Sequence, residues 1–312
     1  MDISLETACS LLAQGEVVAL PTETVYGLAA SMAHPDAVAK IFTLKGRPSN
    51  NPLIIHVADL EQIYPYAAVI PPHFTELAAS FWPGPLTVVL PIHPHLVPEK
   101  IRAGLATAAF RIPQHPLALK VLQSAGPLVM PSANLSGKPS ATQAAHVEKD
   151  FGSHFPVLEG GACRRGLEST ILYHMEGKWR IVRLGSLFPE QFEPLLGYKP
   201  PVHQGDKVIC PGQLHRHYAP KAQLLINSEF SPAEIGYVLG FSDRNYSDCK
   251  IFSLGKSDQP EKIAENLYEA LRALDEAKIQ RVWVDNDFPQ NGLWLTISER
   301  LARASCSSPS VL

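Results

Sequence analysis

Residues 45–57 read Lys45-Gly46-Arg47-Pro48-Ser49-Asn50-Asn51-Pro52-Leu53-Ile54-Ile55-His56-Val57 and join a basic loop to a continuous apolar run. The apolar run predicts a strand covered on both faces, because a half-exposed strand would alternate apolar and polar residues. In an extended segment, Lys45 and Arg47 would point the same way, since they are two residues apart. Two cations on one side of a loop suit a polyphosphate. From the pair alone, two solvated surface charges are the commoner arrangement.

Other short apolar runs predict further strands in the first half of the chain, at residues 17–20, 86–90, 108–112 and 127–130. Apolar residues at helical spacing predict a helix over residues 5–14, and Pro35-Asp36 is typical of another helix start. Residues 169–183 predict a β-hairpin with Glu176-Gly177 at its turn. This mixture indicates the α/β class, in which ligands commonly bind at strand ends.

The second half of the chain changes character after residue 187. Prolines recur through residues 188–221, which predicts a linker. Beyond it, strands are expected at residues 223–226, 235–240 and 282–284, and helices at 260–278 and 292–304. The predicted domains are therefore residues 1–187 and 222–312, and the second is a small βαβ-type layer.

The composition indicates a folded chain that resides in a reducing compartment. Of the 312 residues, 46% are hydrophobic and 18% are charged, which is not typical of disorder. The net charge of −3 argues against attraction of nucleic acid to the whole surface, and a local basic cleft stays open. Five scattered cysteines without a C-x-x-C pair favour neither a disulfide framework nor a zinc site. We expect a cytoplasmic protein without a membrane segment, because neither a secretory signal nor a membrane-spanning apolar run is evident.

Four more motifs carry polar groups that could serve chemistry. They are Pro131-Ser132-Ala133-Asn134-Leu135-Ser136-Gly137-Lys138-Pro139-Ser140, residues 21–28 (PTETVYGL), Thr107 with Arg111, and residues 166–170 (GLEST) with Arg183. The first could bind a ligand through side-chain and backbone donors, or could simply be a capping loop. Arg111 could hold a carboxylate with its guanidinium fork, or could be an ordinary rim arginine.

Familiar nucleotide and metal motifs are missing from the sequence. It contains neither G-x-x-x-x-G-K-[ST] nor G-x-G-x-x-G, so any ATP phosphates must be held by another arrangement. His215-x-His217 lacks evident further ligands nearby, and we therefore expect no metal site made by the protein alone.

In their order and spacing, the motifs resemble the YrdC-like family of threonylcarbamoyl-AMP synthases in its long, two-domain form. The matching segments are PTETVYGL (21–28), KGRPSNNPLIIH (45–56), WPGPLT (82–87), Thr107 to Pro113, PSANLSG (131–137), ESTI (168–171), RLG (183–185) and PGQLHRHYAP (211–220). The resemblance implies a twisted mixed sheet with a concave basic cavity, a linker crossing that cavity, and a small Rossmann-like C-terminal domain.

The resemblance also implies the reaction and its participants. ATP, L-threonine and bicarbonate would give threonylcarbamoyl-AMP and pyrophosphate, with Mg²⁺ accompanying ATP. The product would serve threonylcarbamoyladenosine modification of tRNA next to the anticodon, so tRNA threonylcarbamoyltransferase proteins would act downstream and RNA could be contacted. Catalysis would fall to Lys45 and Arg47. ATP contacts would include Lys45, Arg47, Asn51, Thr107, Asn134, Ser140 or Thr142, Arg183 and Tyr218, and threonine contacts Thr24, His56, Arg111, Ser132 and Ser169.

Other functions stay open at this point. A hydrogenase-maturation carbamoyltransferase contains a similar domain, but that class carries C-x-x-C pairs that this chain lacks. A non-catalytic RNA-binding module is a second alternative, although basic residues interleaved with aromatic ones are not evident. A regulatory sensor of threonine or of a nucleotide is a third.

Overall fold

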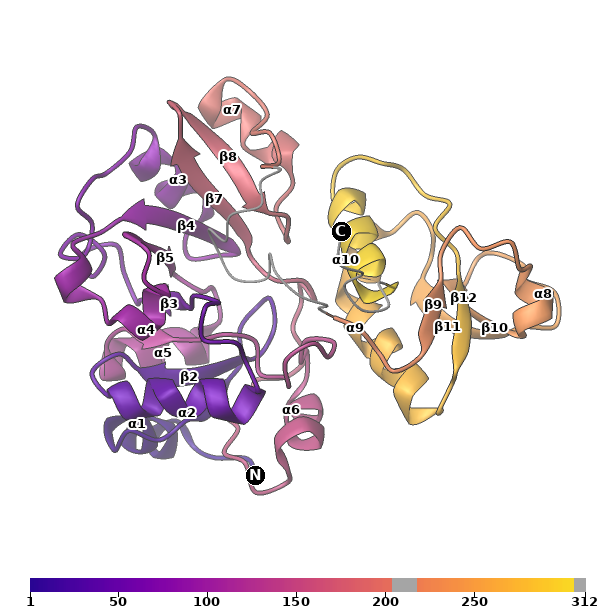
Figure 1. The fold of residues 1–312 in the computed structure, drawn as a ribbon, viewed down its shortest axis with the longest axis horizontal. Helices are drawn as coiled ribbons and strands as arrows, with labels where there is room; N and C mark the ends of the chain where they lie inside the picture. The colour runs from indigo at the N-terminus through magenta and orange to yellow at the C-terminus, as the bar shows by residue number, and fades with distance from the viewer. Residues whose placement is uncertain (204–217, 306–312) are drawn as a thin grey trace.

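The protein folds into two α/β domains that lie side by side in the computed structural model (Figure 1). The structure describes residues 1–203 and 218–305. Residues 204–217, with the middle of the predicted linker and His215-x-His217, lie outside the described residues, as do residues 306–312 of the predicted second domain. Among the helices of the described ranges, none combines the length and the apolar character needed to span a membrane.

An eight-stranded mixed sheet forms the centre of the first domain, in the order β1-β2-β6-β3-β5-β4-β7-β8. Only β3/β5 and β4/β7 pair in parallel. The strands are β1 (Val18–Leu20), β2 (Gly27–Ser31), β3 (Ile54–His56), β4 (Leu86–Pro91), β5 (Thr107–Arg111), β6 (Leu128–Val129), β7 (Thr170–Met175) and β8 (Lys178–Arg183). The α-helices are α1 (Leu5–Ala13), α2 (Pro35–Lys45), α3 (Phe74–Phe81), α4 (Glu99–Arg102), α5 (Pro116–Ala125), α6 (Ala144–Phe151) and α7 (Glu193–Leu196), with 3₁₀ turns at Pro94–Leu96 and Pro189–Gln191.

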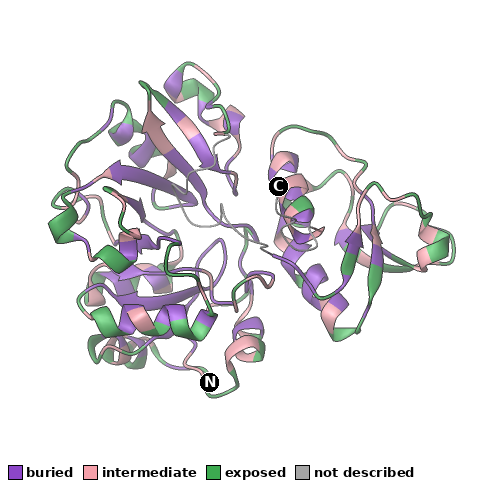
Figure 2. Ribbon diagram, in the orientation of Figure 1, coloured by how far each residue is buried: buried purple, intermediate pink, exposed green. Residues whose placement is uncertain are grey.

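Alternation along the central strands separates a large apolar core from a polar hollow. One face of these strands is buried in the main core, which makes the sheet purple in Figure 2. On the other face, Ile54 and Ala109 belong to a small apolar cluster. His56 and Arg111 lie two residues further along the same strands and therefore project from that same face. They are paired in the parallel β3/β5 ladder, so two polar side chains meet at the carboxyl ends of these strands.

The predicted fold class is confirmed, and the hairpin forms as expected. Glu176 and Gly177 both have positive φ, at 52° and 74°, as a tight two-residue turn between twisted strands requires. The segment after β8 departs from the linker predicted to begin at residue 188. Phe192 and Leu196 are buried in the main core, and the His203 N–H donates to the Ile181 carbonyl, so residues up to 203 pack on the first domain.

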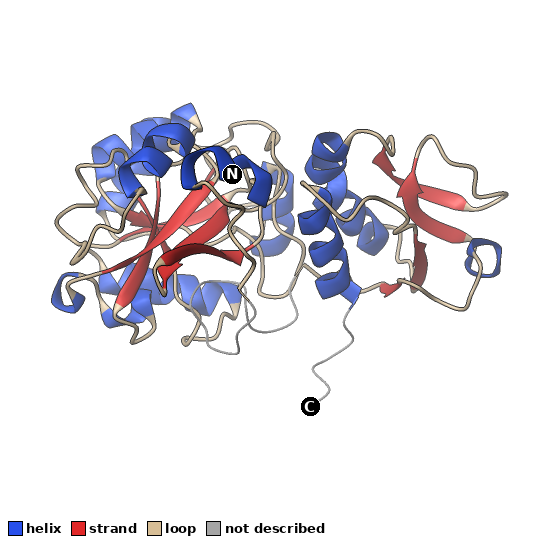
Figure 3. Cartoon of the chain, turned by 90° about the horizontal axis from the view of Figure 1, so that it is seen from above, coloured by secondary structure: helices blue, strands red, loops and turns tan. Residues whose placement is uncertain are grey.

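The second domain has a four-stranded parallel sheet in the order β11-β10-β12-β9. Its helices α9 and α10 stand between this sheet and the first domain (Figure 3). Its elements are β9 (Gln223–Leu225), α8 (Pro232–Ile235), β10 (Tyr237–Phe241), β11 (Lys250–Gly255), α9 (Pro260–Glu276), β12 (Arg281–Val284) and α10 (Trp294–Ser305). Strand β10 starts two residues later than the strand predicted at residues 235–240, because a capping box at Ser231 makes residues 232–235 helical.

Candidate functional site

A polar cavity lies over the carboxyl ends of β3 and β5. The space between its walls, opening included, is about 570 Å³. Segments far apart in the sequence supply the lining, which consists of Val25, Arg47, Pro52, Leu53, Ile54, His56, Arg111, Met130, Pro131, Ser132, Glu168, Ser169, Arg183 and Tyr218. The cavity thus gathers seven of the residues that the sequence nominated: Arg47, His56, Arg111, Ser132, Ser169, Arg183 and Tyr218.

Lys45 and Arg47 are placed by a helix end, so the prediction of an extended segment was wrong. Helix α2 ends at Lys45, and Gly46 adopts the left-handed conformation (φ 60°) typical of a helix C-terminus. Arg47 then lines the cavity and donates from Nη2 to the Pro52 carbonyl at 2.8 Å. The Lys45 ammonium is buried beside the cavity and donates to the carbonyls of Ser132 (2.5 Å) and Asn134 (2.6 Å). Lys45 therefore binds the loop after β6.

Positive charge accumulates at this wall. Burial, with a contribution from the Arg183 charge, lowers the pKa of Arg47 to about 10. Burial and the nearby Arg47 also hold the pKa of Lys45 well below its ordinary value. Arg47 remains charged at neutral pH, and each cation makes its neighbour's charge less favourable. An anion in the cavity would relieve this repulsion.

A buried ion pair closes another side of the cavity. Arg111 Nη2 lies 2.7 Å from Glu23 Oε1, and both side chains are under 10% exposed. Glu23 Oε2 also accepts from the Gln114 N–H at 3.0 Å, and Arg111 Nε donates to the Gly84 carbonyl at 3.2 Å. Sequence reasoning assigned Glu23 no role, although a carboxylate inside PTETVYGL was the signal for a partner to Arg111. Arg111 thus reaches the cavity already oriented by a carboxylate.

Ser169 is fixed from two directions at the start of β7. Arg183 Nη2 donates to its carbonyl (2.8 Å) and to its Oγ (3.1 Å), and the hydroxyls of Thr87 and Ser169 are 2.7 Å apart. Gly185 permits this arrangement, because a Cβ there would lie 2.5 Å from the carbonyl carbon of Ser169. The Arg183-Leu184-Gly185 motif therefore places a guanidinium against the cavity by close backbone approach.

Glu168 connects the cavity with the second domain. Its Oε1 accepts from Ser140 Oγ (2.6 Å), and its Oε2 accepts from Tyr268 OH (2.9 Å) and Arg300 Nε (3.1 Å). Burial alone would raise its pKa, yet the charges of Arg300 and Arg183 hold the pKa of Glu168 below the ordinary value. The sequence placed Glu168 in a motif without a role, and its partners on α9 and α10 were not recognisable.

Tyr218, the first described residue after 204–217, packs against two of the partners of Glu168. Its ring stacks on Tyr268 with centroids 5.4 Å apart, and the Arg300 guanidinium lies 4.6 Å from its centre. The chain thus returns to the cavity wall at Tyr218 before it enters the second domain.

Several nominated residues do not line the cavity. Thr107 lies at the opposite end of β5, paired with Pro91. Thr24 is buried with its hydroxyl 2.8 Å from that of Thr22, and Thr142 lies beside His146. Asn51 and Asn134 are also buried near the cavity, and among the described residues neither Oδ1 has a hydrogen-bond partner. Buried acceptors without partners are uncommon, so these two oxygens are unusual features of the loops beside the cavity.

Acidification should destabilise the first domain through His56. Burial, followed by the Arg111 charge, holds the pKa of His56 well below its ordinary 6.5. Below pH 6.5, His56 therefore binds a proton in the unfolded chain but stays neutral in the folded one. The free energy of unfolding that is present above pH 6.5 is lost as the pH falls below this value. For one group, the limiting slope is about 1.4 kcal/mol per pH unit. Urea denaturation between pH 7.5 and 5 should show a steeper loss for the wild type than for His56→Gln, and equal slopes would contradict this explanation.

Comparisons with known proteins agree with this arrangement of domains. One family model, described as "Telomere recombination", matches residues 10–185, and another, described as "Threonylcarbamoyl-AMP synthase, C-terminal domain", matches residues 187–306. The threonylcarbamoyl-AMP synthases of Bacillus subtilis (strain 168) and Pyrococcus abyssi (strain GE5 / Orsay) are each 39% identical to this chain. The alignments cover 97% and 96% of the chain, and 93% and 94% of these relatives. The crystal structure of P. abyssi Sua5 complexed with L-threonine matches with a TM-score of 0.88 at 37% identity, over 96% of this chain and 94% of that one.

Proposed function

Because this chain belongs to the threonylcarbamoyl-AMP synthase family, we propose that its cavity joins ATP, L-threonine and bicarbonate into threonylcarbamoyl-AMP and releases pyrophosphate. The product would supply threonylcarbamoyladenosine modification of tRNA. The convergence of Arg47 and Arg183 on one wall of the cavity, with the buried Lys45 behind it, is the observation that carries the proposal. Mutually repelling cations around one cavity favour a polyanion, and phosphoryl transfer depends mainly on such charge and positioning.

The chemistry consists of two steps. The threonine amine attacks CO₂ derived from bicarbonate and loses a proton, which forms a carbamate. A carbamate oxygen then attacks the α-phosphorus of ATP, and the bond to the bridging oxygen breaks as pyrophosphate leaves. The protein would bring the two anions into line and offset their charge, so that the attacking oxygen lies near the α-phosphorus.

The cavity walls suggest which residues would hold each substrate. Arg47 and Arg183 would contact the phosphates, with Lys45, Asn51, Asn134, Ser140, Thr142 and Tyr218 completing the nucleotide set. Arg111 would bind the threonine carboxylate, because Glu23 holds its guanidinium in place. His56, Ser132 and Ser169 line the cavity and would complete the threonine set with Thr24, whose hydroxyl lies 2.8 Å from that of Thr22. Thr107 lies too far along β5 to favour a direct contact, since each strand residue advances about 3.3 Å.

Mg²⁺ would accompany ATP as an ion bound mainly by phosphate oxygens. Groups of three or more metal-binding side chains are not found among residues 1–203 and 218–305, and both Glu168 in the cavity wall and Glu23 behind Arg111 already have arginine partners. Mg²⁺ commonly binds through substrate phosphates with few protein ligands. We further propose that the protein works in the cytoplasm and that the adenylate passes to tRNA threonylcarbamoyltransferase proteins, with or without RNA contact.

A direct assay tests the reaction. The purified full chain should form labelled threonylcarbamoyl-AMP from ATP, threonine and [¹⁴C]bicarbonate, and should release pyrophosphate in equal amount. Omitting threonine should remove the labelled adenylate, and chelating Mg²⁺ should slow the reaction. Salt-sensitive RNA binding without any threonine-dependent pyrophosphate would instead favour a non-catalytic RNA-binding module.

A further inference from the structure

Helix α9 has two faces that serve different domains. Its apolar face, including Ile263, Leu267 and Leu271, is buried in the core of the second domain. Its other face is polar and contacts the first domain. Its contacts with the first domain include one hydrogen bond, from Tyr268 to Glu168, and three ion pairs. The ion pairs join Glu269 to His146, Arg272 to Asp150, and Glu276 to Lys149.

Arg272 is the most deeply buried cation of this polar face. Its Nη2 lies 2.8 Å from Asp150 Oδ2 and donates to the Pro139 carbonyl at 2.6 Å. The side chains of Arg272 and Asp150 are 8% and 2% exposed. The guanidinium of Arg272 thus binds both α6 and the end of the loop formed by residues 131–140, called here the PSAN loop.

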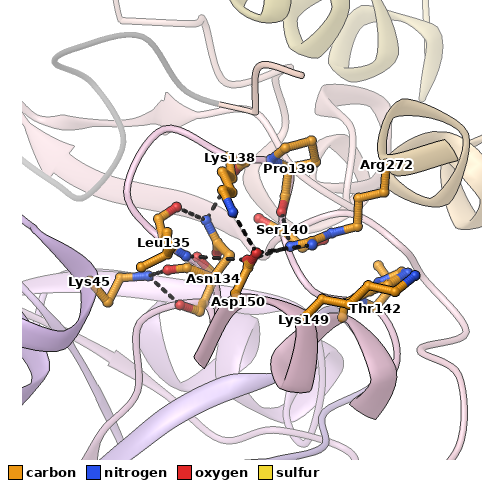
Figure 4. Close-up of polar contacts among 12 residues, drawn as sticks. Lys45, Asn134, Leu135, Lys138, Pro139, Ser140, Thr142, Lys149, Asp150 and Arg272 are labelled. Atoms are coloured by element: carbon orange, nitrogen blue, oxygen red, sulfur yellow. Dashed lines mark hydrogen bonds and ion pairs between the residues drawn. The ribbon is translucent and has the colours of Figure 1, made fainter. Parts of the chain in front are cut away.

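Asp150 also contacts the middle of the PSAN loop and so connects it to Arg272. Its Oδ1 binds Lys138 Nζ at 3.0 Å, and its Oδ2 lies 3.4 Å from the Leu135 nitrogen. The Asn134 amide then donates to the carbonyls of Leu135 (2.8 Å) and Lys138 (3.0 Å). Figure 4 shows these contacts as one connected set that runs from Arg272 to Lys45.

The connected set ends at groups that the reaction would need. The Lys45 ammonium binds the Asn134 carbonyl, and Asn134 Oδ1 is one of three buried side-chain acceptors without a hydrogen-bond partner among the described residues. The same loop is held a second time from the second domain, because Ser140 binds Glu168, which in turn binds Tyr268 and Arg300. Positions of Asn134 and Lys45 therefore depend on contacts that originate in α9 and α10.

We propose that Arg272 is a positioning residue for adenylate formation: from the second domain it fixes the PSAN loop in the conformation that binds the nucleotide. The inference rests on the proposed function, since it assumes that this loop serves ATP. Arg272 itself does not line the cavity, so it would act through Asp150 and the carbonyls of Pro139 and Ser140.

A purely structural role for Arg272 predicts a different outcome. The neighbouring Lys149–Glu276 pair also joins α6 to α9, but its side chains are half-exposed, and no hydrogen bond or ion pair links it to the PSAN loop among the described residues. Glu276→Ala therefore removes a contact between the same two helices without disturbing the loop, which makes it the matched control.

Steady-state kinetics of threonine-dependent pyrophosphate release in the full chain would test the inference. Arg272→Ala should raise KM for ATP by about tenfold or more, because small misplacement of binding groups is costly. KM for threonine should change less than about twofold, since most residues proposed for threonine lie on other segments. Glu276→Ala should leave both KM values near those of the wild type.

Two further variants keep the test decisive if Arg272→Ala folds poorly. Arg272→Lys keeps the charge opposite Asp150 but lacks the guanidinium fork, so it should show a smaller rise that is still selective for ATP. Asp150→Ala combined with Arg272→Ala leaves neither charge of this pair without its partner, and it should still raise KM for ATP more than KM for threonine.

Equal changes for both substrates, or equal effects of Arg272→Ala and Glu276→Ala, would overturn the inference and leave the enzyme's activity standing. A wild-type chain without threonine-dependent pyrophosphate release would overturn the proposed function and this inference together.

Discussion

Arg47→Ala should lower kcat/KM for adenylate formation by about 10²–10³-fold, the usual effect of removing one preorganised donor from a charged transition state. Arg47 lines the cavity and remains cationic although burial lowers its pKa to about 10. Without Arg47, only Arg183 and Lys45 of these three cations would remain to offset the charge of the phosphates. Pyrophosphate release measured at varied ATP would give kcat and KM separately, and an unchanged circular dichroism spectrum would show that the fold is kept.

Arg102→Ala is the matched control for this experiment. Arg102 also binds two backbone carbonyls of an adjoining loop, those of Val97 and Leu105, at 3.2 and 3.0 Å. It does not line the cavity. If Arg102→Ala lowers activity as much as Arg47→Ala, loop anchoring rather than phosphate binding explains the loss, and the proposed role of Arg47 is wrong.

Arg111→Met should lower the free energy of unfolding of the first domain by about 3–5 kcal/mol, the typical result of leaving one partner of a buried ion pair uncompensated. Glu23 would then remain in a site where its side chain is only 8% exposed. The same variant should bind threonine poorly, because it lacks the guanidinium proposed for the substrate carboxylate. Chemical denaturation followed by tryptophan fluorescence would report stability, and KM for threonine would report binding.

Two comparisons isolate the buried charge. Glu23→Gln combined with Arg111→Met should recover part of the lost stability, since neither charge is then left alone. Arg180→Met removes an arginine with a contact of similar length, 2.8 Å to Glu176, but Glu176 is 78% exposed. That change should cost at most about 1 kcal/mol. Equal losses for Arg111→Met and Arg180→Met would contradict the explanation from burial.

Continuous apolar runs predicted the central strands well, because strands covered on both faces must be apolar throughout. Strand β2, with its small residues Gly27 to Ser31, carried no comparable signal and was missed. The hairpin was predicted correctly because its turn residues have a local conformational requirement. The predicted linker began too early, since Phe192 and Leu196 enter a core built from distant parts of the chain.

The candidate site was predicted through motifs rather than through geometry. The order of the motifs, through the family resemblance, predicted that Arg47, His56, Arg111 and Ser169 share one cavity, and they line one cavity in the structure. Spacing misled at Lys45, because a helix end with Gly46 replaces the extended segment.

The contacts of Glu168 with Tyr268 and Arg300 join positions 100 or more residues apart. Such pairing depends on how two finished domains dock. Neither local propensity nor spacing in a single sequence carries that information.

The polar face of α9 limits where the chain can be truncated without damage to the first domain. Ending the chain at residue 203 would strip Asp150 of its arginine and Glu168 of Tyr268 and Arg300, exposing two acidic groups shaped for absent partners. Catalytic defects in such a half-length protein would then reflect unmatched acids as much as missing substrate contacts. A chimera with a foreign C-terminal half should therefore transplant Tyr268, Arg272 and Arg300 as one inseparable set.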